Sequence, residues 1–138
     1  MPITAVLLLV ATSLYAGFQW TIRVVVYPQF TAVPREAFHA YEAAHQRRVT
    51  VAVGPLFLFA GGAAVAAFVA GPGWATGVAA VCVAGIVLVT GLAAVPQHRR
   101  LGDGFVPAAH ARLLAVDTAR LVLALLAVAA AAVHATSG

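Results

Sequence analysis

Three side chains in the first polar segment could carry acid–base chemistry. Glu42 and His45 stand three residues apart, so on a helix they lie on one face, and Tyr41 is next to Glu42. Because histidine titrates near neutral pH, His45 could act as a general base that Glu42 orients, while Tyr41 donates a hydrogen bond. We therefore take Tyr41, Glu42 and His45 as candidate catalytic residues, and the alternative is a chance pairing on a helix surface.

The same spacing occurs in carboxylate-bridged metal sites, but those sites use two Glu-x-x-His motifs and further carboxylates. This chain has only four acidic residues in total. His98 and His110, in a later polar segment, could join His45 in a three-histidine site for zinc, copper or iron. Their spacing does not demand such a site. We assign no metal ligand, and the cofactor stays open.

Three charged residues, Arg23, Asp117 and Arg120, fall within long apolar segments. An unpaired charge at the centre of a membrane helix costs about 2.5–3.5 kcal/mol on insertion scales, so such groups pair or line a wet cavity. Asp117 and Arg120 are three residues apart and can meet on one helix face. We expect Asp117 to accept hydrogen bonds from Arg23, Arg120 or both. A structural ion pair between the first and fourth spans and a functional polar site both remain open interpretations.

The composition indicates which elements must position these residues. The chain is 63% apolar and 9% charged, whereas soluble domains carry about 25% charged residues. Four stretches are long and apolar enough for membrane helices, at about 3–26, 51–70, 74–95 and 113–133. Backbone groups in lipid must be satisfied internally, and no stretch alternates like a barrel strand. We predict an all-α fold, a single membrane domain over 1–138 that forms an integral membrane four-helix bundle in the lipid bilayer.

A short amphipathic helix is predicted over about 34–48, between the first two spans. Pro28 ends the first helix, and Pro34 can take the first position of the next one. Apolar and polar side chains that share one face of this helix include Phe38 and His45. The helix could also continue into the second span, with a kink at Pro55.

The arginines predict the topology. All arginines outside the spans lie in the first and third connections, and the middle turn at 71–73 carries no charge. The positive-inside rule then places both arginine-bearing connections in the cytoplasm and both termini outside, in a multi-pass protein of the cell membrane. The net charge of +4 is explained by these arginines, so we predict no nucleic-acid partner. A single cysteine, Cys82, excludes an internal disulfide.

Two runs resemble known membrane families. The first is Val26-Tyr27-Pro28-Gln29-Phe30 with the later residues Phe38, Tyr41, His45 and Arg48. It resembles a family of small uncharacterised bacterial four-helix membrane proteins. The second is His98-x-x-Leu101-x-x-Gly104 followed by Leu114-x-x-Asp117-x-x-Arg120. It is similar to the anthrone-oxygenase-like membrane family, in which an Asn often stands at the position of Asp117. The resemblance implies a four-helix membrane fold and an oxygenase that acts on a polycyclic aromatic anthrone.

The residues that carry the resemblance coincide with the polar groups that the topology gathers at the cytoplasmic face. We expect them to form a pocket for a lipophilic small molecule, with substrate-binding roles for Arg23, Arg48, His98, Asp117 and Arg120. The alternatives are a membrane oxidoreductase or oxygenase for an aromatic or quinone-like substrate, and a small transporter or subunit of a membrane assembly. No P-loop, dinucleotide-binding or serine-hydrolase motif occurs. The ligand and the oligomeric state stay open.

Overall fold

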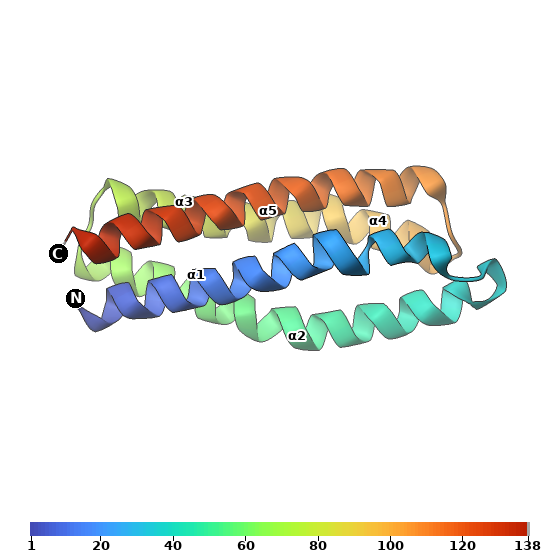
Figure 1. Ribbon diagram of the computed structural model, residues 1–138, viewed down its shortest axis with the longest axis horizontal. Helices are drawn as coiled ribbons and strands as arrows, with labels where there is room; N and C mark the ends of the chain where they lie inside the picture. Colours follow the sequence, from blue (N-terminus) through green and yellow to red (C-terminus); the bar gives the residue numbers. More distant parts are fainter. Residues whose placement is uncertain (138) are drawn as a thin grey trace.

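The computed structural model describes residues 1–137, which form four helical rods and contain no strand (Figure 1). The rods comprise α1 (Ile3–Thr21) with η1 (Ile22–Val26) and η2 (Pro28–Ala32); α2 (Arg35–Ala70); α3 (Trp74–Val89) with η3 (Thr90–Ala94) and α4 (Val95–Gly102); and α5 (Pro107–Thr136). Here η1 and η3 are π-helical turns, and η2 is a 3₁₀ turn. The predicted all-α fold is confirmed, and each rod is long and apolar enough to cross a membrane.

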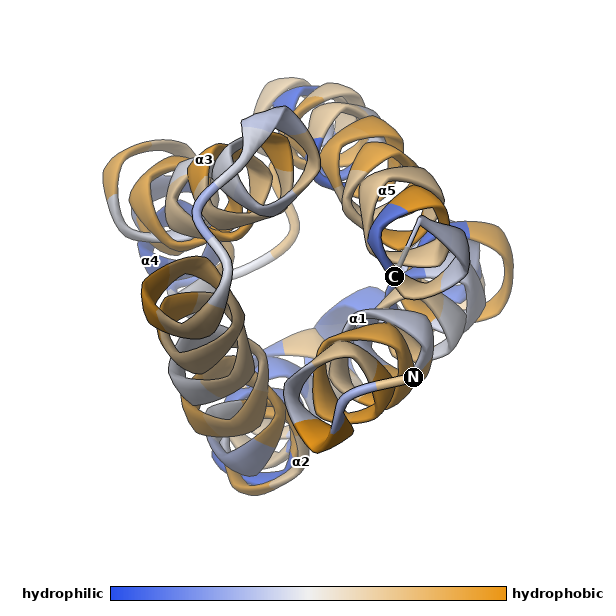
Figure 2. Ribbon diagram, turned by 90° about the vertical axis from the view of Figure 1, so that its left-hand side faces the viewer, coloured by the Kyte–Doolittle hydropathy of each residue, from blue (hydrophilic) through white to orange (hydrophobic). Residues whose placement is uncertain are grey.

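The rods stand at the corners of a square when the bundle is viewed end-on (Figure 2). Helix α1 packs against α2 and α5, and α3 packs against the same two helices. Both termini and the α2–α3 turn lie at one end, which we call the terminal end (Figure 1). The other two connections, at 33–34 and 103–106, lie at the opposite end, which we call the loop end. The chain therefore runs up, down, up and down with short connections.

Small side chains fill most of the core in the terminal-end half of the bundle, and many large apolar side chains face outward. One core cluster consists mainly of alanines, among them Ala60, Ala64, Ala79, Ala127 and Ala131. Exposed positions instead carry residues such as Leu58 and Leu92, which are 79% and 78% exposed. Helices in lipid associate by close packing of small residues, whereas large apolar side chains are at no disadvantage against acyl chains. This distribution is the one expected of a helix bundle whose solvent is hydrocarbon.

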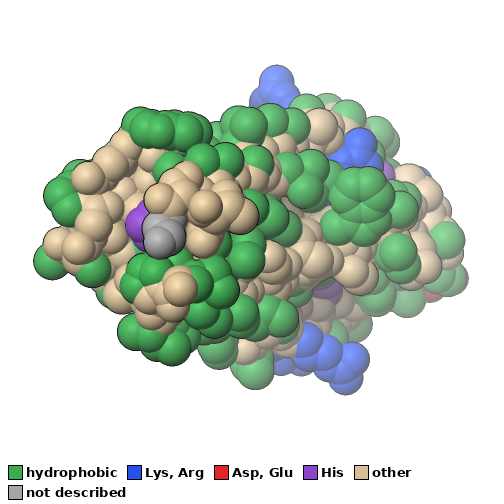
Figure 3. Space-filling model, turned by 60° about the vertical axis from the view of Figure 1, so that its left-hand side comes forward, with side chains coloured by type: hydrophobic (Ala, Val, Ile, Leu, Met, Phe, Trp, Pro, Cys, Tyr) green, Lys and Arg blue, Asp and Glu red, His purple; other side chains and the backbone are tan. Residues whose placement is uncertain are grey.

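Charge is confined to the half of the bundle nearest the loop end. On the face shown in Figure 3 the arginine side chains lie away from the terminal end, where the surface is apolar or uncharged. The two carboxylates that are exposed, Glu36 and Asp103, lie near the two loop-end connections. The other two, Glu42 and Asp117, are fully buried. The polar groups that could carry function are therefore inside the loop-end half of the bundle.

The predicted helix over 34–48 is not a separate element. It is the first part of α2, which runs unbroken through 36 residues, or about 54 Å at 1.5 Å per residue. The sequence between Arg48 and Gly54 contains no glycine or proline, so nothing ends the helix where the second span was predicted to begin. Pro55 lies inside α2, where it removes the hydrogen bond to the carbonyl four residues earlier and its ring crowds that carbonyl. The predicted amphipathic face is present, because Phe38 is buried while Arg48 is exposed.

Two π-helical turns shift the register of the first and third rods at the same level of the bundle. The N–H of Tyr27 bonds the carbonyl of Ile22, five residues earlier, at 3.0 Å. The N–H of Val95 likewise bonds the carbonyl of Thr90. Each turn holds one residue more than an α-helical turn, so the side chains beyond it are rotated to a different face. Such turns are frequent at functional sites, and here both adjoin the polar interior.

Candidate functional site

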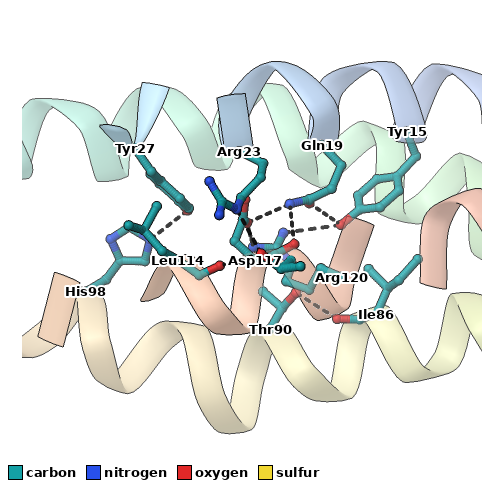
Figure 4. Close-up of polar contacts among 11 residues, drawn as sticks. Tyr15, Gln19, Arg23, Tyr27, Ile86, Thr90, His98, Leu114, Asp117 and Arg120 are labelled. Atoms are coloured by element: carbon teal, nitrogen blue, oxygen red, sulfur yellow. Dashed lines mark hydrogen bonds and ion pairs between the residues drawn. The ribbon is translucent and has the colours of Figure 1, made fainter. Parts of the chain in front are cut away.

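A buried polar network joins α1 to α5 in the loop-end half (Figure 4). The side-chain amide of Gln19 donates to Asp117 Oδ1 at 2.6 Å, and Arg120 Nη1 donates to the same oxygen at 3.3 Å. Arg120 Nη2 donates to the Tyr15 hydroxyl at 3.2 Å, and that hydroxyl donates to Gln19 Oε1 at 2.8 Å. The four residues form a closed ring of hydrogen bonds. One positive and one negative charge offset each other within it.

Arg23 lies outside this network, although the sequence placed it one turn from Gln19. Its Nε donates to the Thr118 hydroxyl at 2.8 Å on the exposed side of the bundle. The buried stripe of the first rod runs from Gln19 to Ile22 and then, across the π-helical turn, to Tyr27, so Arg23 lies beside this stripe. Asp117 thus accepts hydrogen bonds from Arg120, as predicted, but in the structure the contribution from the first rod comes from Gln19.

A second polar chain links three rods near the loop end. Glu42 Oε1 on α2 lies 2.6 Å from His98 Nδ1 on α4. His98 Nε2 lies 3.0 Å from the Tyr27 hydroxyl. The side-chain amide of Gln46 donates to Glu42 Oε1 and to the His98 carbonyl, each at 3.2 Å. When Nδ1 carries the proton toward the carboxylate, Nε2 is left as the acceptor for the Tyr27 hydroxyl.

Glu42 therefore orients His98 in the structure. The predicted pairing partner, His45, lies on the same face of α2, but its ring packs among aromatic rings. Its centroid is 5.1 Å from that of Phe30 and 5.6 Å from that of His98. Tyr41 stacks on His45 at 6.4 Å. These contacts make His45 and Tyr41 part of an aromatic cluster behind the polar chain.

A cavity of about 180 Å³ separates the polar chain from the closed network. Tyr27, His98 and Arg120 all line it, together with apolar side chains such as Phe18 and Val53. Both π-helical turns contribute to the wall, through Ile22 in the first rod and through Thr90 and Ala94 in the third. The cavity thus combines apolar side chains with polar groups from all four rods, among them Tyr27, His98 and Arg120, which is the composition typical of a small-molecule site.

Several buried polar atoms around the cavity have no hydrogen-bond partner within residues 1–137. They include Arg120 Nε, Asp117 Oδ2 and Glu42 Oε2. An unsatisfied buried polar atom carries the full cost of its desolvation. Of the three residues, Arg120 lines the cavity and can offer a donor to a molecule bound there. The other two lie immediately behind cavity-lining groups, because Asp117 bonds Arg120 and Glu42 bonds His98.

The remaining candidates are dispersed. Arg48 is exposed on the outer side of α2, and the cavity lining does not include it. His110 Nε2 lies 2.8 Å from the Tyr27 carbonyl, so this histidine holds the turn between η1 and η2. His45 and His98 are neighbours, but among the described residues no three His, Cys, Asp or Glu side chains are grouped closely enough to hold a metal ion.

Sequence reasoning missed Tyr27 and Gln46 as site residues. Tyr27 appeared only within the first resembling run, although it follows Gln19 by eight residues and is the first polar aromatic residue beyond it. A stripe of Tyr15, Gln19 and Tyr27 at near-helical spacing is the signal that could have indicated it. Gln46 lies one turn after Glu42 on the same helix. Its role depends on α4, whose approach to α2 is a tertiary contact.

Comparison of the chain with protein-family models, with curated proteins and with solved structures gives no match. The functional interpretation therefore depends on the geometry and chemistry of the cavity.

Proposed function

We propose that this chain is a multi-pass membrane protein that binds a small lipophilic molecule with an acidic hydroxyl or anionic oxygen. The observation that carries the proposal is the cavity of about 180 Å³, whose lining brings Tyr27, His98 and Arg120 together with several apolar side chains. Arg120 supplies a cation that is only 5% exposed. A charge-assisted hydrogen bond in such surroundings is about twice as strong as a neutral one.

The membrane setting is supported by the four apolar rods and by the distribution of charge. Rods of about 30 residues exceed the roughly 20 residues that cross the hydrocarbon. The excess length therefore extends past the membrane at the loop end, where the arginines are. The positive-inside rule places this end in the cytoplasm and both termini outside. The cavity then lies near the cytoplasmic boundary of the bilayer.

Cysteine labelling tests this topology. In a Cys82→Ser background, Asp103→Cys and Ser137→Cys place single thiols at the loop end and the terminal end. A membrane-impermeant maleimide added to intact cells should label Ser137→Cys and should label Asp103→Cys only after lysis. Labelling of both thiols in intact cells, or of Asp103→Cys alone, would contradict the orientation.

The binding test uses phenol as the probe, because one ring with one acidic hydroxyl matches the cavity in size and polarity. Isothermal titration of phenol into protein in lipid nanodiscs should show one saturable site. Arg120→Gln should weaken binding by roughly 10- to 100-fold, the equivalent of the 1.5–3 kcal/mol of a hydrogen bond to a charged group. The double variant Asp117→Asn/Arg120→Gln removes both charges and should bind as weakly as Arg120→Gln.

Arg112→Gln is the matched control, because it makes the same change at an exposed position on the same helix. Its affinity for phenol should equal that of the wild-type chain. Equal affinity of all four proteins, or no saturable binding by any of them, would show that the cavity is not a site for acidic hydroxyls.

A proton-transfer enzyme is the second candidate, and the chain from Glu42 through His98 to Tyr27 favours it. A carboxylate that holds one imidazole nitrogen orients the other as a base. A ligand hydroxyl that bonds the Tyr27 oxygen could pass its proton to that oxygen as the Tyr27 proton moves to His98 Nε2. The resulting anion would remain beside Arg120. Proton removal of this kind would begin the oxidation of a phenol or an enolisable ketone, which is the membrane oxidoreductase alternative.

The probe 4-nitrophenol separates the two candidates, because its anion absorbs at a longer wavelength than the neutral phenol. Below the pKa of the free probe, binding to a proton-accepting site should produce the nitrophenolate band. His98→Gln should keep binding but lose that band. A bound probe with the spectrum of the neutral phenol would exclude the enzyme candidate and leave the binding function intact.

A further inference from the structure

We propose that the cavity opens sideways between α2 and α4, so that its ligand is a single-ring head attached to a tail that remains in the lipid. This inference rests on the proposed binding function and adds to it the class of ligand and the route by which the ligand arrives.

The exposure of the lining residues locates the opening. Three residues of the lining are exposed, namely Thr50 on α2 and Val95 and Arg99 on α4. The lining residues from the first rod and from α5 are not exposed, and two of them, Ile22 and Arg120, are buried. Since the exposed part of the wall is confined to two facing helices, the cavity reaches the surface between them.

The cavity is closed along the bundle axis in both directions. Toward the terminal end, a layer from all four rods crosses the bundle, consisting of Tyr15, Phe57, Ile86 and Ala124. Toward the loop end, a second cluster includes Tyr27, Phe30 and Phe38, which are at most 2% exposed. A ligand therefore cannot come from the aqueous phase along the axis without displacing packed aromatic side chains.

The π-helical turn in the third rod accounts for the gap beside α2. The turn η3 (Thr90–Ala94) separates α3 from α4 and changes the direction in which α4 presents its side chains. Pro96 follows in the first turn of α4, where its fixed backbone angle starts the new segment. The residues of α4 that face the gap, Val95 and Arg99, are one turn apart and lie on one side of the helix.

The volume of the cavity limits what it can hold. An engineered apolar cavity of about 150 Å³ binds benzene, and this one measures about 180 Å³. Pockets that enclose drug-sized ligands measure about 300–1,000 Å³. One ring fits, and any further part of a lipophilic ligand must pass through the opening. The opening has the chemistry for this, because Val53 and Val95 offer an apolar surface to the tail.

Arg99 gives the opening a positive charge. Its side chain is exposed, and it directly follows His98 in the cavity lining. A cation at a cleft raises the local concentration of anions and of acidic hydroxyls that ionise. The head of the ligand would thus meet Arg99 at the membrane boundary and Arg120 in the interior, while the tail stays level with the acyl chains.

The test compares phenol with 4-octylphenol, which carries the same head and an alkyl tail, in phosphatidylcholine nanodiscs. Thr50→Trp places a bulky side chain in the opening. Val51→Trp is the matched control, because Val51 is the next residue, nearly equal in size to threonine, 76% exposed and not part of the lining. Affinities are measured by titration calorimetry and corrected for partition of each phenol into empty nanodiscs.

Wild-type protein and Val51→Trp should bind both phenols. Thr50→Trp should weaken the binding of 4-octylphenol at least about tenfold more than it weakens the binding of phenol, a difference of 1.4 kcal/mol. Equal effects of Thr50→Trp on both probes would overturn the lateral opening, as would wild-type protein that binds phenol but excludes 4-octylphenol. Failure of the wild-type protein to bind either probe would instead remove the binding function itself.

Discussion

Removal of the Asp117 carboxylate should destabilise the bundle by an amount that the network geometry sets. Asp117 is fully buried, and it accepts from Gln19 at 2.6 Å and from Arg120 at 3.3 Å. Breaking a buried ion pair by removing one partner costs about 3–5 kcal/mol, because the other charge stays buried and unpaired. Arg120 keeps its bond to the Tyr15 hydroxyl and borders a cavity that can admit water. We therefore expect Asp117→Ala to cost about 3 kcal/mol, at the low end of that range.

The assay is reversible unfolding in mixed detergent micelles, followed by circular dichroism. A loss of about 3 kcal/mol lowers the midpoint of thermal unfolding by roughly 10 °C for a chain of this size. Asp103→Asn, at an exposed loop position, is the control and should stay within about 0.5 kcal/mol of wild type. The double variant Asp117→Leu/Arg120→Met replaces the ion pair with apolar groups and should be more stable than Asp117→Ala.

An unfolding free energy of Asp117→Ala within about 0.5 kcal/mol of the wild-type value would contradict a stabilising role of the carboxylate. A lower stability of Asp117→Leu/Arg120→Met than of Asp117→Ala would show that an uncompensated charge is not the source of the loss. Either result would mean that the Asp117 carboxylate does not stabilise the network between α1 and α5.

Two further substitutions test the loop-end half. Tyr27→Phe keeps the ring contacts with Phe30 and His45 but removes the hydroxyl that meets His98. The substitution should lower the free energy of unfolding by about 1 kcal/mol and weaken phenol binding in nanodiscs. Unchanged binding would show that the Tyr27 hydroxyl does not contribute to ligand recognition. Phe38→Ala empties a fully buried position in the aromatic cluster and should lower the free energy of unfolding by about 3–5 kcal/mol. Phe68→Ala, at a 44% exposed position, is the control and should lower it far less in the same micelle assay. Equal losses would mean that the aromatic cluster is not a packed core.

The helices and one polar contact could be predicted from local sequence. Runs of some 20 apolar residues indicate membrane-length helices, and their ends follow from Pro28, Gly71 and Gly104. Asp117 and Arg120 lie on one helix three residues apart, so their pairing needs no knowledge of the tertiary fold. Confinement of the polar groups to one end also follows from the sequence, because it reflects where the arginines stand.

The cavity and its polar partners could not be predicted in this way. Counting by α-helical turns put Arg23 one turn from Gln19, but Arg23 bonds Thr118 on the exposed side. The π-helical turn then adds a residue and brings Tyr27 to the interior. Glu42 could have oriented His45 on its own helix, yet it pairs with His98, which arrives from 56 positions away. These outcomes depend on how the helices pack, and no local pattern in a single sequence predicts that packing.

The most direct test of the central claim is the position of a bound phenol. Crystals of the protein in lipidic mesophase, soaked with 4-bromophenol, would reveal the bromine by anomalous scattering. We expect one peak inside the cavity, with the phenol oxygen toward Arg120 and Tyr27 and the bromine toward the gap between α2 and α4. Peaks confined to the outer, lipid-facing surface of the rods, with the cavity empty, would contradict the account.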